Sequence, residues 1–280
     1  MLLLLATPLA ARADAVAEAR AHFVSGRFRE CLAILEPLPE SARDADVLNM
    51  LGGSYAQLGL SDDAQRAFRA AIRRFPDHLA AYQNLGAFLL ERNANQEAVE
   101  VLTPAVSRFP KSHGLIRTLG VACQRAGRYE EAHAQFRRLP DSDALLGDSY
   151  LESGDYPAAL AYLNQAARKH PTDAKISYLL GLAHSYRADA DSAQAALQRV
   201  LELDPRFCLA YHQLTKLKLD ASDVFGALAY GKQAIQCDPQ LAPPHYLMSR
   251  IHSMLGDAAE SEEEMRLFLS LRLDTHGTKP

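Results

Sequence analysis

The sequence predicts an all-α fold, in which short antiparallel helix pairs stack into a solenoid. Three observations support this prediction. Glycine, alanine and proline recur with a common spacing of 34 residues, the apolar residues between them follow a helical period, and turn residues separate helix-length segments. Helices of about 12–14 residues are only marginally stable alone, so each pair must bury its apolar faces against its neighbours.

The 34-residue period is present in three independent series of small or turn-forming residues. All three series are interrupted by the same deletion of seven residues, so chance does not explain the pattern. The series are Gly52, Gly86, Gly120, Gly147 and Gly181; Ala64, Ala98, Ala132, Ala159, Ala193 and Ala227; and Pro76, Pro110, Pro171, Pro205 and Pro239.

Residues 45–78 show how one repeat is expected to fold. Leu48, Leu51 and Tyr55 recur at helical spacing and predict a first helix. Ser61 is then expected to cap a second helix, which ends before Pro76 because proline cannot continue it. The two helices are expected to meet through Gly52, Ala64, Phe68, Ala71 and Ile72, where Gly52 and Ala64 are small because the helix backbones approach closely.

This pattern resembles the tetratricopeptide repeat family. The 34-residue unit of that family carries an aromatic residue or Leu, then Leu-Gly and Tyr, and later Ala, an aromatic residue or Leu, Ala and a closing Pro. The resemblance covers roughly residues 13–271 in eight units, with a degenerate first unit at about 13–40, and implies a right-handed superhelix over residues 14–271. Two consecutive units supply Leu48, Leu51-Gly52, Tyr55, Ala64, Phe68, Ala71 and Pro76, and then Tyr82, Leu85-Gly86, Leu89, Ala98, Leu102, Ala105 and Pro110.

Three departures from the repeat are apparent. The unit at about 113–139 is seven residues short, so its second helix, around 128–138, is expected to be short and to divide the array into softer halves. Thr215 stands where the repeat usually has glycine. Residues 272–280 lack the period and are expected to form a disordered tail.

Composition and motifs exclude several classes of protein. The 30 basic and 34 acidic residues give a net charge of −4, whereas a nucleic-acid binder normally carries a basic excess. No run of 18 apolar residues is present, so no membrane span is predicted. Phosphate-binding, zinc-protease and CxxC motifs are absent, so we predict no enzyme activity, no catalytic residue, no cofactor and no metal site.

Two features resemble metal sites but have a simpler interpretation. His245 and His252 share a helix face, but both occupy slots that normally hold interior aromatic residues, and we interpret them as packed imidazoles. The acidic run at 260–264 follows Asp257 in an ordinary capping arrangement, and the rest of the run is interpreted as a solvated face.

Residues 1–13 are interpreted as a signal peptide. An apolar run precedes Ala11-Arg12-Ala13, which has the small-x-small form of a cleavage site and would leave Asp14 as the new N-terminus. A periplasmic or secreted location follows from this interpretation. The positively charged segment that usually precedes the apolar run is missing, so the alternative is a mis-started terminus and a cytoplasmic protein.

The four cysteines permit one disulfide bond. Cys31 and Cys123 fall at interior slots and are interpreted as small packing residues. Cys208 opens the first helix of its unit and Cys237 follows the second, and antiparallel helices bring such ends together. A disulfide between them is conceivable in an exported protein, and the sequence leaves open whether they are bonded.

The family resemblance places the first helix of each unit on a concave groove. Aromatic and cationic side chains gather there in the last three units, a mixture suited to an extended or helical peptide of acidic character. Near the deletion, Asp141, Asp148 and Glu152 would favour a basic segment instead. An alternative is that all these residues only solvate the groove wall. The candidate peptide-binding residues are Arg117, Arg125, Tyr178, Tyr186, His212, Lys216, Tyr246 and Arg250.

The predicted function is a non-catalytic scaffold that binds a protein or peptide in its groove and assists assembly of an envelope or secretion complex. The carboxylate clamp of some family members is not supported, because Gly53 and Thr118 stand where an Asn and an Arg are wanted. The alternatives are a cytoplasmic regulatory adaptor and an accessory subunit of a separately encoded enzyme. The sequence constrains the charge and shape of the partner, but it does not identify the partner.

Overall fold

The computed structural model describes residues 9–277, with side chains described for residues 12–273. Within these residues the regular structure is entirely helical, with sixteen α-helices, one short 3₁₀ helix at Glu40–Ala42 and no strand. The predicted all-α fold of paired helices is confirmed. The chain divides into two compact units, residues 1–139 and 140–280, which we call the N-terminal unit and the C-terminal unit.

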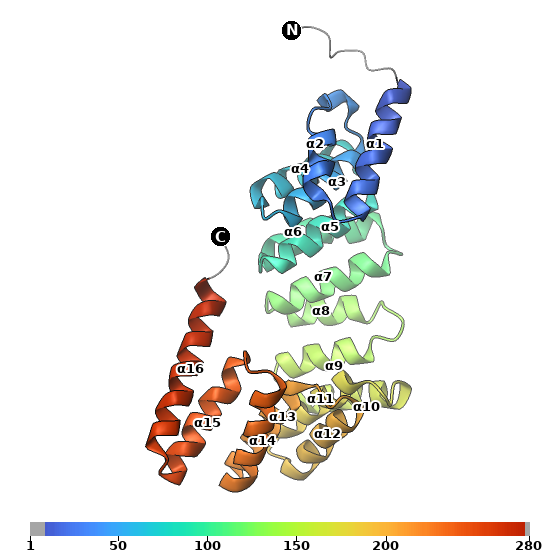
Figure 1. Ribbon diagram of the computed structural model, residues 1–280. Helices are drawn as coiled ribbons and strands as arrows, with labels where there is room; N and C mark the ends of the chain where they lie inside the picture. The colour runs from blue at the N-terminus through green and yellow to red at the C-terminus, as the bar shows by residue number, and fades with distance from the viewer. Residues whose placement is uncertain (1–8, 278–280) are drawn as a thin grey trace. The chain divides into compact units, whose positions relative to one another are not determined.

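The N-terminal unit contains four helix pairs, coloured blue to green in Figure 1. Each first helix packs on the second helix of its own pair, and the first helices of consecutive pairs, α1, α3, α5 and α7, also contact one another. The pairs are α1 (Leu9–Val24) with α2 (Phe28–Leu35), α3 (Ala45–Gln57) with α4 (Ser61–Arg74), α5 (Leu79–Glu91) with α6 (Asn95–Arg108), and α7 (His113–Arg125) with α8 (Tyr129–Phe136).

The C-terminal unit repeats this arrangement. The first helices α9, α11, α13 and α15 again contact one another in order, and each packs on the second helix that follows it. The pairs are α9 (Asp143–Glu152) with α10 (Tyr156–Lys169), α11 (Ala174–Tyr186) with α12 (Ala190–Leu203), α13 (Cys208–Asp220) with α14 (Val224–Cys237), and α15 (Ala242–Leu255) with α16 (Ala258–Gly277).

Five glycines of the first helices accommodate a large side chain that lies sixteen residues later on the second helix. A Cβ placed on Gly52 would lie 2.6 Å from the ring of Phe68, and one placed on Gly86 would lie 2.8 Å from Leu102. The gap at each glycine is therefore filled mainly by a side chain, and at Gly147 the backbone N of Leu163 also lies 3.2 Å from the added Cβ. The same contact joins Gly120 to Phe136, Gly147 to Leu163 and Gly181 to Leu197.

The α13–α14 pair reverses this size relation. Thr215 occupies the glycine slot of α13, and the residue sixteen positions later is Gly231. A Cβ on Gly231 would lie 2.4 Å from Sδ of Met248 and 3.5 Å from Cγ2 of Thr215. Both Thr215 and Met248 are buried. They fill the space that a large residue of the second helix fills in neighbouring pairs.

We expect Gly231→Leu alone to lower the free energy of unfolding of the C-terminal unit by about 2–3 kcal/mol, because the leucine overlaps Met248. Adding Thr215→Gly should restore about 1 kcal/mol or more, since it reopens the gap that Leu197 fills beside Gly181. Urea unfolding of both single variants and the double variant measures this coupling. Strictly additive effects would contradict the proposed complementarity.

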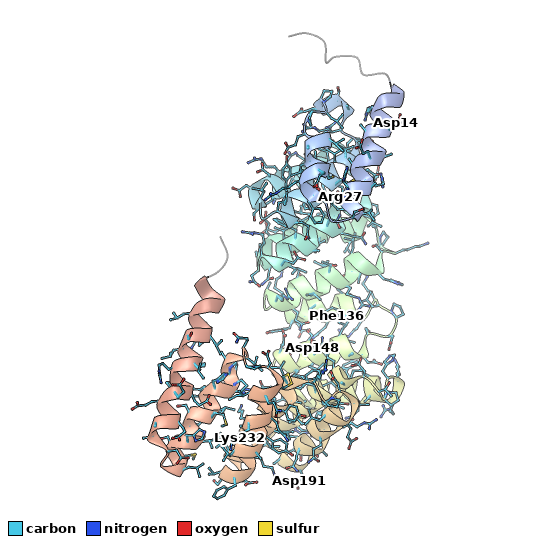
Figure 2. The ribbon with its side chains drawn as sticks, viewed as in Figure 1. Asp14, Arg27, Phe136, Asp148, Asp191 and Lys232 are labelled. Carbon is cyan, nitrogen blue, oxygen red and sulfur yellow. A yellow bond between two sulfur atoms is a disulfide. The ribbon has the colours of Figure 1, made fainter. Side chains whose placement is uncertain are left out.

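The seven-residue deletion falls on the α7–α8 pair. Helix α8 has 8 residues, whereas α4, α6, α10, α12 and α14 each have 14. Phe136, labelled in Figure 2, is the last residue of α8 and is fully buried, and Leu139 is buried directly after it. The short second helix agrees with the expectation for this unit. The boundary between the two compact units follows immediately, after residue 139.

Ser61 does not cap α4, which corrects the expectation from the sequence. Gly59 has a φ of +77°, and the turn that it makes places Leu60 at the N-cap, so Ser61 is already the first helical residue. The Ser61 hydroxyl donates to the carbonyl of Gly59 at 3.4 Å instead. Side-chain caps occur on second helices of the C-terminal unit, where Asp155 and Asp223 accept from backbone N–H groups at 3.1 and 2.8 Å.

The C-terminal helix is longer than the repeat predicts. Helix α16 continues through Gly277, so residues 272–277 are helical rather than disordered, and residues 278–280 lie outside the described residues. The slot that holds the closing proline at Pro239 holds Leu273 one period later, so nothing in the sequence stops the helix there. The guanidinium of Arg272 lies 5.5 Å from the ring centroid of Phe268, one turn earlier.

The expected signal peptide lies partly outside the described residues. Residues 1–8 are not described, whereas residues 9–13 form the first turns of α1. Arg12 donates to the carbonyl of Ala42 and lies 3.9 Å from Asp44. No helix within residues 9–277 has both the length and the apolar character needed to cross a bilayer.

Candidate functional site

Six of the eight candidate residues lie on consecutive first helices of the C-terminal unit. Helices α11, α13 and α15 contact one another in that order, so residues one period apart occupy matching positions on neighbouring helices. The six residues are Tyr178 and Tyr186 on α11, His212 and Lys216 on α13, and Tyr246 and Arg250 on α15.

The three tyrosines differ in exposure. Tyr178 is half-buried against Phe207, with ring centroids 4.9 Å apart, and burial raises the pKa of its hydroxyl. Tyr186 is 55% exposed and stacks on Tyr156 at 5.3 Å, whereas Tyr246 is 41% exposed and packs against Phe268. Tyr186 and Tyr246 are therefore held by one aromatic neighbour each while a large part of each ring stays accessible.

His212 and Lys216 lie one turn apart on α13. His212 is half-buried, and its Nδ1 has no hydrogen-bond partner among the described residues. Burial, and then the positive charge of Lys216, lower the pKa of His212, so the imidazole is neutral at neutral pH. Lys216 and Arg250 are exposed, and neither forms a salt bridge with a carboxylate in residues 12–273. These two cations remain available to an acidic partner.

The lowered pKa of His212 predicts that acid weakens the C-terminal unit. In the unfolded chain His212 binds a proton as pH falls below about 6.5, whereas in the folded chain it binds that proton only at lower pH. The free energy of unfolding is therefore highest above about pH 6.5 and decreases as pH falls below that value. Urea unfolding at about pH 5 and pH 7.5 should show a smaller difference for His212→Gln than for the unmodified chain. Equal pH dependence in the two proteins would contradict this assignment.

The remaining two candidates lie on α7 in the N-terminal unit. Arg117 is exposed on that helix. Arg125 is also exposed, but its guanidinium donates to the carbonyl of Leu90 at 3.1 Å, at the C-terminal end of α5. Arg125 thus links α7 to α5 through this hydrogen bond and contributes to the packing of neighbouring repeats.

The acidic residues near the deletion are partly neutralised. Asp141 lies 2.6 Å from Nε2 of His170 and 3.6 Å from Lys169, and these partners lower the pKa of its carboxyl group. Lys169 also pairs with Asp143 at 2.5 Å. This cluster joins the start of α9 to the end of α10, and its charge is therefore less open to a basic partner than the sequence implies.

The histidines interpreted as packed imidazoles have intramolecular partners. His245 is 3% exposed, with Nδ1 2.6 Å from Glu264 and Nε2 3.0 Å from the carbonyl of Pro239. His252 lies 3.3 Å from Asp257. Within the described residues no group of three or more His, Cys, Asp or Glu side chains is arranged to hold a metal ion.

The structure contains the disulfide bond between Cys208 and Cys237, which the sequence alone did not decide. Cys208 and Cys237 are joined, with Cα atoms 5.5 Å apart, and the bond links the start of α13 to the end of α14. Cys31 and Cys123 are free and buried. Burial raises the pKa of Cys31 and raises that of Cys123 to about 11, which makes both thiols poor nucleophiles and supports their role in packing.

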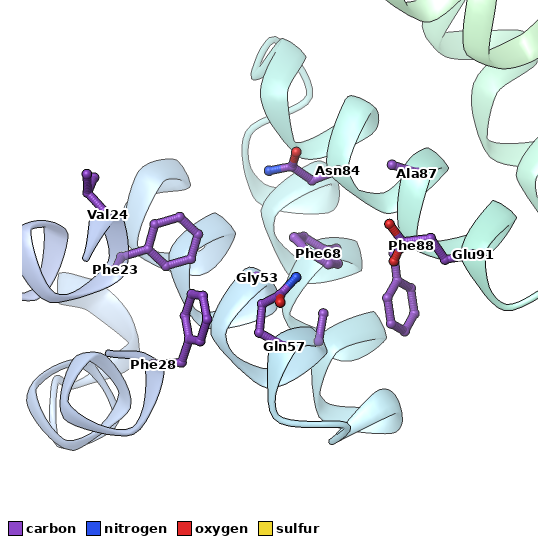
Figure 3. Close-up of a pocket in the computed structure, with 11 residues that line it drawn as sticks. Phe23, Val24, Phe28, Gly53, Gln57, Phe68, Asn84, Ala87, Phe88 and Glu91 are labelled. Atoms are coloured by element: carbon purple, nitrogen blue, oxygen red, sulfur yellow. The ribbon is translucent and has the colours of Figure 1, made fainter. Parts of the chain in front are cut away.

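A pocket in the N-terminal unit was not predicted from the sequence. It has a volume of about 390 Å³ and opens between the end of α1 and the helices α3, α4 and α5; we call it the N-terminal pocket (Figure 3). Small residues at Gly53 and Ala87 leave the space, and Phe23 closes one side, since a Cβ on Gly53 would lie 2.9 Å from its ring. The sequence signal that could have indicated this pocket is the pair of small residues one period apart, Gly53 and Ala87, together with the aromatic residue Phe23. The lining residues are Phe23, Val24, Phe28, Gly53, Ala56, Gln57, Phe68, Asn84, Ala87, Phe88 and Glu91.

The helix-pair fold and the matches of repeat models define the class of this protein. Models described as tetratricopeptide repeat match residues 15–37, 49–113, 89–145 and 150–217. The chain belongs to the tetratricopeptide repeat family. The tetratricopeptide repeat fold implies a protein–protein interaction scaffold.

Particular proteins are similar to parts or most of the chain. The BBSome complex member bbs-4 of Caenorhabditis elegans is 26% identical over 202 residues, which cover 69% of this chain and 44% of that protein. The bovine BBSome complex member BBS4 is 24% identical over 196 residues, which cover 68% of this chain and 38% of that protein. The chain spans less than half the length of these curated relatives.

Solved structures share the fold. A tetratricopeptide repeat protein from Parabacteroides merdae aligns with a TM-score of 0.67 at 16% identity, covering 81% of this chain and 93% of that one. The APC/C hetero-tetramer Cut9-Hcn1 aligns with a TM-score of 0.61 at 16% identity, covering 92% of this chain and 52% of the other. At these identities the similarity establishes the fold alone.

Proposed function

We propose that this protein is a non-catalytic scaffold whose C-terminal unit binds an acidic peptide segment of a partner protein along α11, α13 and α15. The observation that carries the proposal is the combination of accessible aromatic rings with cations that have no salt-bridge partner among the described residues. Tyr186 and Tyr246 stay 55% and 41% exposed, and Lys216 and Arg250 are exposed on α13 and α15. Tyrosine and arginine are enriched among residues that dominate binding energy at interfaces.

We further propose that the protein acts outside the cytoplasm, in the assembly of an envelope or secretion complex. The apolar segment at residues 1–13 and the Cys208–Cys237 disulfide support this location, because structural disulfides persist mainly in oxidising compartments. Cell fractionation with N-terminal sequencing tests it. A mature chain that begins near Asp14 in the exported fraction is expected, whereas an unprocessed chain in the cytoplasm would favour the regulatory adaptor.

The binding proposal is tested by capturing partners from the envelope fraction with purified full-length protein. The variant Tyr186→Ala/Tyr246→Ala/Arg250→Ala removes three accessible groups and leaves the half-buried Tyr178 in place to protect the fold. Phe225 is 75% exposed on the second helix α14, so Phe225→Ala is the matched control for loss of an exposed aromatic ring. We expect the triple variant, and not the control, to lose the specific partner. Identical partners for both proteins would refute the site.

A further inference from the structure

The N-terminal pocket is lined mainly by aromatic and other apolar side chains. Phe68 and Phe88 are 2% and 7% exposed and form the floor, with ring centroids 6.1 Å apart. Phe23 and Phe28 flank the opening in an edge-to-face arrangement at 5.7 Å (Figure 3). Val24, also in the lining, is 80% exposed. An apolar group that entered would therefore cover exposed surface of Phe23, Phe28 and Val24, because Phe68 and Phe88 are already almost fully buried.

Three polar side chains line the pocket, those of Gln57, Asn84 and Glu91. Asn84 donates through Nδ2 to Asn49 at 3.0 Å, which leaves its own amide oxygen available. Glu91 is the one charged residue in the lining, and it forms no salt bridge with a cation in residues 12–273. Arg125, one period further along, is held by the carbonyl of Leu90 rather than by Glu91. The pocket therefore combines aromatic surface with a carboxylate that forms no salt bridge in residues 12–273, while the guanidinium of Arg92 lies 5.8 Å from the ring centroid of Phe88.

We propose that the N-terminal pocket binds a bulky apolar side chain of a partner peptide and that Glu91 pairs with a lysine or arginine next to it in the same peptide. The inference rests on the proposed scaffold function and adds a second recognition element of opposite charge preference. Charge complementarity selects the occupant, because the pocket contributes a carboxylate whereas Lys216 and Arg250 of the C-terminal unit contribute cations. A volume of about 390 Å³ lies within the range of small-ligand pockets and admits one leucine or phenylalanine side chain.

The test uses fluorescein-labelled peptides of Gly and Ser with one variable central pair, titrated with the full chain by fluorescence anisotropy. The central pairs are Leu-Lys, Leu-Glu, Leu-Gln and Gly-Lys. We expect the Leu-Lys peptide to bind about tenfold or more tightly than Gly-Lys, because the leucine is buried. It should bind about three- to fivefold more tightly than Leu-Glu, because the ion pair is solvent-exposed and therefore weak.

Two variants assign this binding to the pocket. Ala87→Leu fills the pocket from an exposed position on α5 and should weaken Leu-Lys binding about tenfold. Glu91→Gln should abolish the preference for Leu-Lys over Leu-Glu. The matched controls are Ala161→Leu, at an exposed position on α10, and Glu130→Gln, at an exposed position on α8, and both should bind as the unmodified protein does.

Failure of this inference is distinguishable from failure of the proposed function. Unchanged binding in Ala87→Leu, an unchanged charge preference in Glu91→Gln, or no binding of any peptide below about 1 mM would each overturn the pocket proposal. The variant Tyr186→Ala/Tyr246→Ala/Arg250→Ala should still bind the Leu-Lys peptide. The capture experiment with that variant tests the C-terminal site on its own, whatever the peptides show.

Discussion

Gly120→Ala is expected to lower the free energy of unfolding of the N-terminal unit by about 2–4 kcal/mol. The added Cβ would lie 2.4 Å from a ring carbon of Phe136, which is fully buried. Phe136 is the last residue of the eight-residue helix α8. The ring can move away from the added Cβ only if the backbone at the end of this short helix also moves, which would break α8. Chemical unfolding measures the loss, and hydrogen exchange should show it first in α7 and α8.

Gly114→Ala on the same helix is the matched control. A Cβ there would meet only Nε2 of Gln83, the far end of a flexible side chain, at 2.8 Å. Because alanine favours the helix over glycine, this variant should be unchanged or more stable by up to about 1 kcal/mol. Equal effects of the two substitutions on the free energy of unfolding would show that the contact with the ring of Phe136 does not decide the outcome.

Loss of the Cys208–Cys237 disulfide is expected to destabilise the C-terminal unit by about 3–4 kcal/mol. The bond closes a loop with a sequence separation of 29 residues, and the chain-entropy model of the unfolded state gives this magnitude for such a loop. Cys208→Ser/Cys237→Ser should lower the urea midpoint of the oxidised protein. A reducing agent should lower the midpoint of the unmodified protein to the same value.

The other two cysteines provide the control for this experiment. Cys31 and Cys123 are free, so the double serine variant should be insensitive to the reducing agent. If the reducing agent leaves the unmodified protein unchanged, or if mass mapping of exported protein finds Cys208 and Cys237 as thiols, the bond does not contribute to stability in the proposed compartment.

Much of the fold could be predicted from the sequence because the same residue positions pack against one another in each repeat. The period that links Gly52 to Gly86 also fixes which side chain meets which, and a glycine is followed sixteen residues later by a large residue in five pairs. The exceptions had local causes. Ser61 misses the N-cap because Gly59 sets the turn, and α16 continues because Leu273 replaces a closing proline.

Less of the candidate site could be predicted, because a groove position reveals its residue type but not the contacts of that residue. Arg117 and Arg125 look equivalent in sequence, yet Arg125 is held by the carbonyl of Leu90. Asp141 was grouped with acidic residues available to a partner, yet His170 and Lys169 pair with it. In both cases the missing information was the position of a long side chain from another helix.

The sequence by itself determined the paired helices, their period, the shortened unit and the lack of a recognisable catalytic motif, because each of these follows from spacing along one chain. The tertiary structure decided the disulfide between Cys208 and Cys237, the exchange of sizes between Thr215 and Gly231, and the N-terminal pocket. These features depend on distances between side chains of different helices. Such distances are fixed only when the helix pairs pack closely against one another.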